Sequence, residues 1–123
     1  MPYVDTDFFL ALFKEKDWLK PNASLLAKKY QNNLWTSLTT AIELFMLSEE
    51  YNLDINRVAR DLIQMTIIKG VDANTVFVAA QYIEEGMTVF DAFHAAFCGS
   101  DEMISSDKKF DKFGISRIQL ERY

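Results

Sequence analysis

Hydrophobic and polar positions group along the chain into short blocks that predict strands and helices in turn. Residues 2–5 predict a strand, which is followed by an apolar stretch to Phe13 and by the charged segment "KEKDWLK", closed by Pro21. Further strands are predicted at residues 34–37, 65–70, 102–106 and 115–120, and a turn or single helical turn at 107–114. Apolar residues at helical spacing, with their capping residues, predict helices at residues 24–30, 38–51, 55–64, 72–85 and 88–99.

This order of elements determines the expected fold class. Strands that alternate with helices imply a three-layer α/β domain, with a mainly parallel sheet flanked by helices. The 123 residues are enough for one core, so residues 1–123 are expected to form a single domain.

Acidic residues follow two of the predicted strands. Asp5 and Asp107 are expected at the same edge of the sheet, because ligands of open parallel sheets bind at the carboxyl ends of the strands. An ionised carboxylate in an apolar setting such as that of Asp5 is costly unless it is paired, hydrogen-bonded or bound to a metal.

Two further acids lie at predicted helix starts. Glu43 in "TAIE" and Asp91 in "TVFD" each follow a threonine by three residues, which is the spacing of a capping box. Asp107 in "SSDKKF" has the sequence of an ordinary turn residue that bonds its own backbone. Taken singly, each of these acids therefore has a purely structural explanation.

The ordered set of four acidic stretches is more specific than any one of them. "YVDTDFFLALF", "WTSLTTAIELF", "MTVFDAFHAAF" and "ISSDKKFDKFG" resemble, in that order, the motifs of the PIN-domain nucleases, especially their small single-domain toxins of the VapC type. The resemblance spans nearly the whole chain and includes the polar companions of the acids, Thr6, Ser37 and Ser106. It implies a five-stranded parallel sheet flanked by helices and a dimeric assembly.

The resemblance also implies the site residues. By position, the catalytic and metal-binding acids would be Asp5, Glu43, Asp91 and Asp107, with Asp111 as a looser fifth. Asp7 stands where many relatives have asparagine, so a direct role in metal binding is left open for it.

Clustered carboxylates suit the hydrolysis of an anionic phosphodiester. They hold one or two Mg²⁺ or Mn²⁺ ions, which activate water and neutralise charge at the phosphate. The function implied is that of a metal-dependent endoribonuclease with an RNA substrate, acting as the toxin of a toxin–antitoxin pair and bound by a small antitoxin protein. A PIN nuclease of RNA processing with no antitoxin is the alternative within the family, and a partner-binding scaffold is the non-enzymatic one.

Other families share single features with this chain. "DTD" after an apolar strand resembles the first motif of haloacid-dehalogenase-type phosphatases. That motif normally continues into Gly or Val and Thr, whereas Phe8 and Phe9 follow here. A phosphoacceptor receiver domain would need an acid at the end of a middle strand, whereas Asp54 follows a predicted helix. Asp91 and His94 have the spacing of a di-iron helix motif, but the chain has one histidine and cannot supply the second pair. His94 is therefore interpreted as a packing residue or a neighbour of the ligands.

Charge and composition limit the remaining function classes. A net charge of −5 and the lack of a basic tract argue against bulk electrostatic capture of nucleic acid. If four of the 18 acidic residues belong to one metal site, the rest nearly balance the 13 Lys and Arg. Lys108, Lys109 and Lys112 near the expected rim of the site would guide RNA. No membrane-spanning or signal segment is recognised, and the single Cys98 is expected to be reduced and buried, so a cytoplasmic protein is expected.

Overall fold

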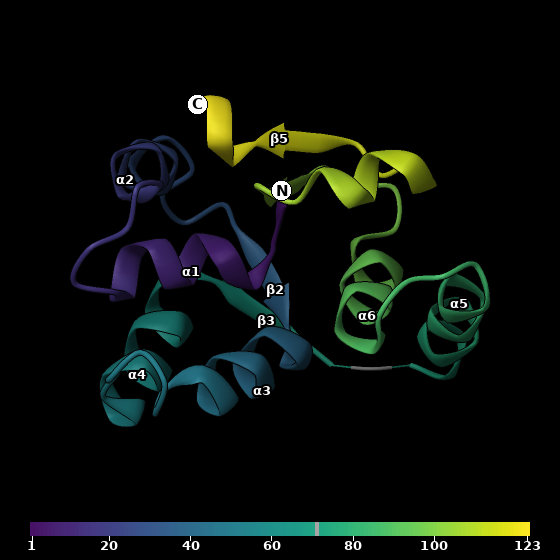
Figure 1. The fold of residues 1–123 in the computed structure, drawn as a ribbon, viewed down its shortest axis with the longest axis horizontal. Coiled ribbons are helices and arrows are strands. Elements are labelled where there is room, and N and C mark those ends of the chain that lie inside the picture. The colour runs from purple at the N-terminus through teal and green to yellow at the C-terminus, as the bar shows by residue number, and fades with distance from the viewer. Residues whose placement is uncertain (71) are drawn as a thin grey trace.

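Five parallel strands form one sheet between two layers of helices in the computed structural model, which describes residues 1–70 and 72–123 (Figure 1). The strand order is β3-β2-β1-β4-β5. The strands are β1 (Tyr3–Val4), β2 (Trp35–Ser37), β3 (Ile67–Lys69), β4 (Met103–Ser105) and β5 (Arg117–Gln119). The predicted α/β class with a parallel five-stranded sheet is therefore confirmed.

Helices connect these strands. They are α1 (Thr6–Phe13), α2 (Lys20–Lys29), α3 (Leu38–Leu47), α4 (Ile55–Met65), α5 (Ala73–Glu84) and α6 (Val89–Cys98). Two short 3₁₀ helices, η1 (Lys108–Phe113) and η2 (Leu120–Arg122), follow β4 and β5. Within the described part of the chain, no helix is both long enough and apolar enough to span a bilayer.

The alternation of side chains along the strands divides the core between the two faces of the sheet. Val4 and Ile104 pack with residues of α1 to α4, whereas Tyr3 and Met103, one position earlier in each strand, pack with residues of α5, α6 and η1. Figure 1 shows α1 to α4 grouped on one side and α5 and α6 on the other. Cys98 is buried and unpaired in the second cluster, as expected.

The first half of the chain departs most from the predicted elements. The apolar stretch after Asp5, for which no element was predicted, is the helix α1, and Asp5 is its N-cap. The next helix begins at Lys20 rather than residue 24, because the fixed φ of Pro21 suits the first turn of a helix. Pro21 thus starts this helix instead of closing the segment before it.

The position of Glu43 also differs from the prediction. α3 begins at Leu38 with Ser37 as its N-cap, so Glu43 lies in the second turn, and the capping-box explanation of its spacing from Thr40 does not apply. The hydroxyl of Thr40 lies 2.7 Å from that of Thr36 in the core. The helix ends at Leu47 rather than near Tyr51.

Predictions for the second half agree more closely with the structure. Asp72 caps α5 by accepting a hydrogen bond from the backbone N–H of Thr75, and Gly86 follows the helix with a φ of +110°, which favours glycine. Thr88 caps α6 by accepting from the N–H of Asp91 at 3.4 Å. The predicted single helical turn after β4 is η1.

A nearly buried arginine fastens the edge strand β5. The guanidinium of Arg117 donates to the backbone carbonyl of Ser105 at 2.8 Å, to Asp111 at 2.9 Å and to Glu121 at 3.0 Å. Its side chain is 2 % exposed. These bonds link the end of β4, η1 and η2, so Arg117 holds together the part of the chain that carries Asp107.

Replacing Arg117 tests this role. We expect Arg117→Met to lower the free energy of unfolding by about 3 kcal/mol, because removing one partner of a largely buried ion pair leaves Glu121 without its counter-charge. Arg57→Met is the matched control, since Arg57 pairs with Asp61 on the surface with its side chain 60 % exposed, and should cost less than about 1 kcal/mol. Urea unfolding measures both values, and equal losses would contradict the assigned role.

Candidate functional site

Asp5 is fixed at the carboxyl end of β1 by two hydrogen bonds. The backbone N–H of Thr6 donates to Oδ1 at 2.7 Å, and the hydroxyl of Ser105 donates to Oδ2 at 2.7 Å. β1 and β4 pair in parallel with Val4 opposite Ile104, and this register brings Ser105 beside Asp5. The sheet therefore positions this buried carboxylate by both of its oxygens.

Glu43 and His94 meet Asp5 from two helices. His94 Nε2 lies 2.8 Å from Oε1 of Glu43 and 3.3 Å from Oδ1 of Asp5. The hydroxyl of Thr6 donates to the same Glu43 oxygen and lies 3.2 Å from His94 Nε2. One possible ligand atom from each of Asp5, Glu43 and His94 lies within 4.8 Å of the others. Among the described residues, this is the group of acidic and histidine side chains found close enough together to hold a metal ion. We call these three residues the acid–histidine cluster.

The other nitrogen of His94 is held from the sheet. Its Nδ1 lies 2.7 Å from the hydroxyl of Tyr3, which in turn lies 2.8 Å from the hydroxyl of Ser37. All three side chains are fully buried. Because Tyr3 fixes the orientation of the ring, Nε2 is the nitrogen that faces the two carboxylates.

Burial and charge shift the ionisation of the cluster. Burial raises the pKa of Asp5, although His94, Ser105 and Thr6 oppose this shift. Burial alone would also raise the pKa of Glu43, but the hydrogen bonds from His94 and Thr6 bring it below its ordinary value. For His94, burial favours the neutral ring, yet the charges of Asp5 and Glu43 outweigh it and raise the pKa. The protonated form of His94 and the ionised forms of the two acids therefore favour one another.

Asp7 is a further, half-buried acid near the cluster. Its Oδ2 accepts hydrogen bonds from the backbone N–H, at 2.8 Å, and the hydroxyl of Ser106. Its Oδ1 is buried with no hydrogen-bond partner among the residues described. Burial, followed by the charge of Asp5, raises the pKa of Asp7 to about 7. Such an orphaned oxygen beside a second acid is the kind of group that a cation satisfies.

The remaining acids predicted for the site lie outside the acid–histidine cluster. Asp91 is one helical turn before His94 on α6; burial raises its pKa, and the charges of Asp5 and Asp107 add to this rise. Asp107 caps η1 by accepting from the N–H of Lys109, and its own N–H donates to the Ser105 hydroxyl at 3.0 Å. Asp111, the looser fifth, is held by Arg117 instead.

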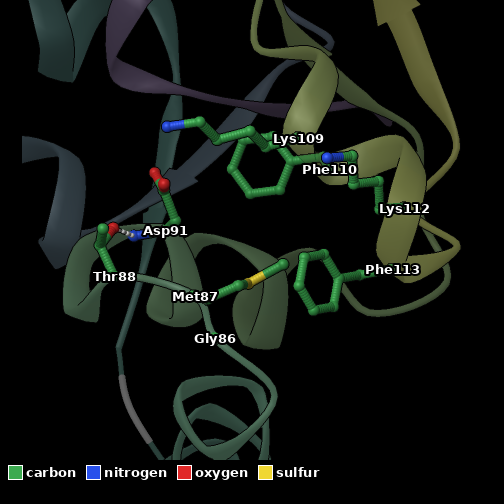
Figure 2. A pocket seen from close by; sticks show the side chains of 8 residues that line it. All are labelled: Gly86, Met87, Thr88, Asp91, Lys109, Phe110, Lys112 and Phe113. Carbon is green, nitrogen blue, oxygen red and sulfur yellow. Dashed lines mark hydrogen bonds between the residues drawn. The ribbon is translucent and has the colours of Figure 1, made fainter.

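A pocket of about 280 Å³ opens next to Asp91 (Figure 2). Its lining comes from the turn before α6, from α6 and from η1: Gly86, Met87, Thr88, Asp91, Lys109, Phe110, Lys112 and Phe113. Two lysines and one acid thus share a cavity with apolar side chains.

Sequence reasoning missed one residue of this site. His94 was expected to be a packing residue or a neighbour of the ligands, and it lies beside Asp5 and Glu43, but Tyr3, which contacts His94 Nδ1, was given no role. The available signal for His94 was that it is the single histidine of the chain, three residues after Asp91 and hence on the same face of its helix.

Comparisons with known proteins agree with this fold. A toxin–antitoxin complex from Klebsiella pneumoniae contains a chain with a TM-score of 0.78 and 18 % identity, with 98 % of each chain covered. FitAcB from Neisseria gonorrhoeae gives a TM-score of 0.79 at 14 % identity over 100 % of both chains. FitAB bound to the IR36 DNA fragment gives 0.77 at 14 % identity, over 98 % of this chain and 95 % of that one. At these identities the likeness concerns the fold, and no curated protein sequence matches the chain.

The sequence itself matches the family model of the PIN domain over residues 3–115. This match covers β1 to β4 and η1, and it excludes the phosphatase interpretation of the "DTD" motif. The chain belongs to the PIN domain family.

Proposed function

We propose that this protein is a metal-dependent endoribonuclease that hydrolyses RNA phosphodiester bonds at the sheet edge where Asp5, Glu43 and His94 meet. The observation that carries the proposal is this pair of acids, the buried Asp5 at the carboxyl end of β1 and the half-buried Glu43 on α3, which His94 joins in a PIN-family chain. Parallel sheets bind their ligands at that edge.

The donor groups suit Mg²⁺ or Mn²⁺. Both ions take carboxylate oxygens as ligands, and the orphaned Oδ1 of Asp7 adds a buried oxygen with no other partner among the described residues. Asp5, Glu43, Asp91 and Asp107 would hold the metal, as the family resemblance implies. A bound ion would supply the Lewis acidity that activates water and neutralises charge at the phosphate.

The chain itself prepares the carboxylates for this task. Thr6 and Ser105 fix Asp5, while Thr6 and His94 fix Glu43, so these two side chains already have one orientation before any ligand arrives. Asp91 is anchored through the Thr88 cap at the start of α6. Such supporting bonds typically change metal affinity or activity by 10- to 100-fold.

The proposed role in the cell is that of a toxin, controlled by a small antitoxin protein. Support comes from a structure of similar fold that is described as a toxin–antitoxin complex. An open acidic site is blocked most simply by an Arg or Lys of a partner, which pairs with the carboxylates. We also propose a cytoplasmic location, where RNA is available as the substrate. A PIN nuclease of RNA processing without an antitoxin remains the second candidate within the family.

We further propose a homodimer. A pocket of about 220 Å³ with an entirely apolar surface lies between α3 and α6, and its lining consists of Leu38, Thr39, Ile42, Val89, Phe90 and Phe93. Leu38 and Val89 are more than half exposed, and a continuous apolar surface of this kind is usually covered. It carries no charge for a polar partner to match, whereas the identical face of a second copy offers the same apolar chemistry.

Neutralising one acid tests the nuclease. We expect Asp5→Asn or Asp91→Asn to lower cleavage of a single-stranded RNA by about 100-fold or more, because one ligand charge is lost at nearly constant shape. Asp61→Asn, on α4, is the control and should cleave like the unmodified protein. Circular dichroism would verify the fold of each variant, and full activity of Asp5→Asn would rule out the proposed site.

Metal binding is expected to stabilise the native state. An ion at a hundredfold excess over its dissociation constant adds about 2.7 kcal/mol, which corresponds to a rise of about 10 °C in the melting temperature. Thermal unfolding with and without Mn²⁺ or Mg²⁺ measures this shift. Glu43→Gln should reduce the shift, and a melting temperature unaffected by either ion in the unmodified protein would contradict a preformed site.

Expression without a partner tests the toxin role. We expect cells that express this protein alone to grow slowly, and to recover when the partner protein from the native host is expressed as well. We expect the purified protein to sediment as a homodimer. The Asp5→Asn variant should leave growth normal. An active nuclease with no effect on growth and no small co-purifying partner would favour the RNA-processing alternative.

A further inference from the structure

The pocket next to Asp91 is built from two segments that flank the proposed active site. Its volume of about 280 Å³ is close to the lower limit for small-ligand pockets, about 300 Å³. Figure 2 shows the Lys109 side chain extending across one side of the pocket, Asp91 and Thr88 at another, and Met87 and Phe113 at its lower edge. Cations, an acid and apolar groups therefore face one space.

Asp91 connects this pocket to the acids. It lines the pocket, and the charges of Asp5 and Asp107 act on its carboxylate. His94 follows Asp91 by one helical turn and contacts both Asp5 and Glu43. A chain-like ligand held in the pocket would thus lie against Asp91, one helical turn from His94 and the acid–histidine cluster.

The two lysines of the pocket are free to bind an anion. Lys109 and Lys112 are both exposed, and neither forms an ion pair with any residue from 1–70 or 72–123. Asp111, which lies between them in the sequence, is engaged by Arg117. With a net charge of −5, the protein needs such local cations to bring a polyanion to a cluster of acids.

Lys108, which the sequence placed with Lys109 and Lys112 among the cations expected to guide RNA, differs from them. It is absent from the pocket lining, and its charge acts instead on Asp111 and Glu121, on the side of η1 that faces Arg117. Of the three lysines on η1, Lys109 and Lys112 therefore line the pocket and Lys108 does not.

Apolar groups complete the pocket. Met87 is 9 % exposed and Phe110 is 1 % exposed, so both present a fixed surface rather than mobile side chains. Phe113 is partly buried against Tyr82, with 6.1 Å between the ring centroids. Aromatic and apolar surfaces next to cations are the pattern of single-stranded nucleic-acid binding, in which bases contact rings and phosphates contact lysines.

We propose that this pocket is a nucleotide subsite for single-stranded RNA, next to the bond that is cut, in which Lys109 and Lys112 bind a backbone phosphate and Met87 and Phe113 contact the adjoining base. The inference rests on the proposed nuclease function and specifies how its substrate is held. A free mononucleotide carries the same phosphate and base, but it lacks the neighbouring phosphate that would extend to the acids.

The test uses RNA binding by the full chain with Asp5→Asn as background, so that the RNA is not cleaved. A short labelled single-stranded RNA is titrated at several salt concentrations in the presence of Mg²⁺. Each phosphate of a single strand that is neutralised contributes about 0.7 to the steepness of log K against log salt, so K109A/K112A, which leaves one phosphate without its cations, should lower the steepness by about 0.7. If binding is equal at 1 M salt, this difference in slope corresponds to about 5-fold weaker binding at 0.1 M salt.

Two further variants separate the contacts. K108A should keep both slope and affinity, since Lys108 lies outside the pocket. Phe113→Ala should weaken binding with an unchanged slope, because it removes a base contact and no charge. A mononucleotide competitor should displace the RNA only weakly if the chain extends to the acids, and displacement at equal concentration would overturn this part of the proposal.

The outcomes distinguish this inference from the nuclease proposal. If K109A/K112A and K108A bind RNA with equal slopes and affinities, and the protein with Asp5 unchanged still cleaves RNA, the subsite is overturned and the nuclease proposal stands. Absence of both RNA binding and cleavage would overturn both. Tight binding of an acidic peptide, but not of RNA, to the same lysines would also overturn the subsite in favour of a protein partner.

Discussion

The contact on which the site depends is that of one histidine with two acids. Asp5 and Glu43 would repel each other at the buried sheet edge, and His94 Nε2 lies within 3.3 Å of both. Tyr3 and Ser37 hold the opposite nitrogen of the ring. These contacts connect β1, β2, α3 and α6. The relative positions of the two carboxylates therefore depend on how these four elements pack.

Short buried segments explain why the order of the elements could be predicted. Met103–Ser105 stands between the polar residues Glu102 and Ser106, and Trp35–Ser37 contains a large aromatic and a β-branched residue, so both read as strands. α1 was missed because its residues are almost all apolar, so no helical face stands out, and its only N-terminal signal is Asp5, an acid that also had a chemical explanation. The start of α2 could not be predicted exactly, because Pro21 can either end one segment or stand in the first turn of the next helix. The local sequence does not decide between these two positions.

The positions of Asp5 and Asp107 relative to the sheet could be predicted more readily than the residues that contact the acids. Asp5 and Asp107 follow strands, and that rule needs only the order of the elements. Placing Glu43 in the second turn of α3, and His94 between two acids, depends on how α3 and α6 pack against β1, which no short sequence pattern encodes. Ser105 was not singled out at all, although it donates to Asp5 and accepts from the N–H of Asp107, because its role follows from strand register alone.

The bond between Ser105 and Asp5 joins residues 100 positions apart in the chain. During synthesis from the N-terminus, Asp5 leaves the ribosome long before β4 exists to pair with β1. Non-local pairing of this kind is also slow to form, because a long loop must close first. A nascent chain that ends before β4 therefore lacks both the partner of Asp5 and the edge that carries Asp107. The proposed activity can arise only after nearly the whole polypeptide has been translated, which gives a cell an interval in which the unfinished protein is harmless.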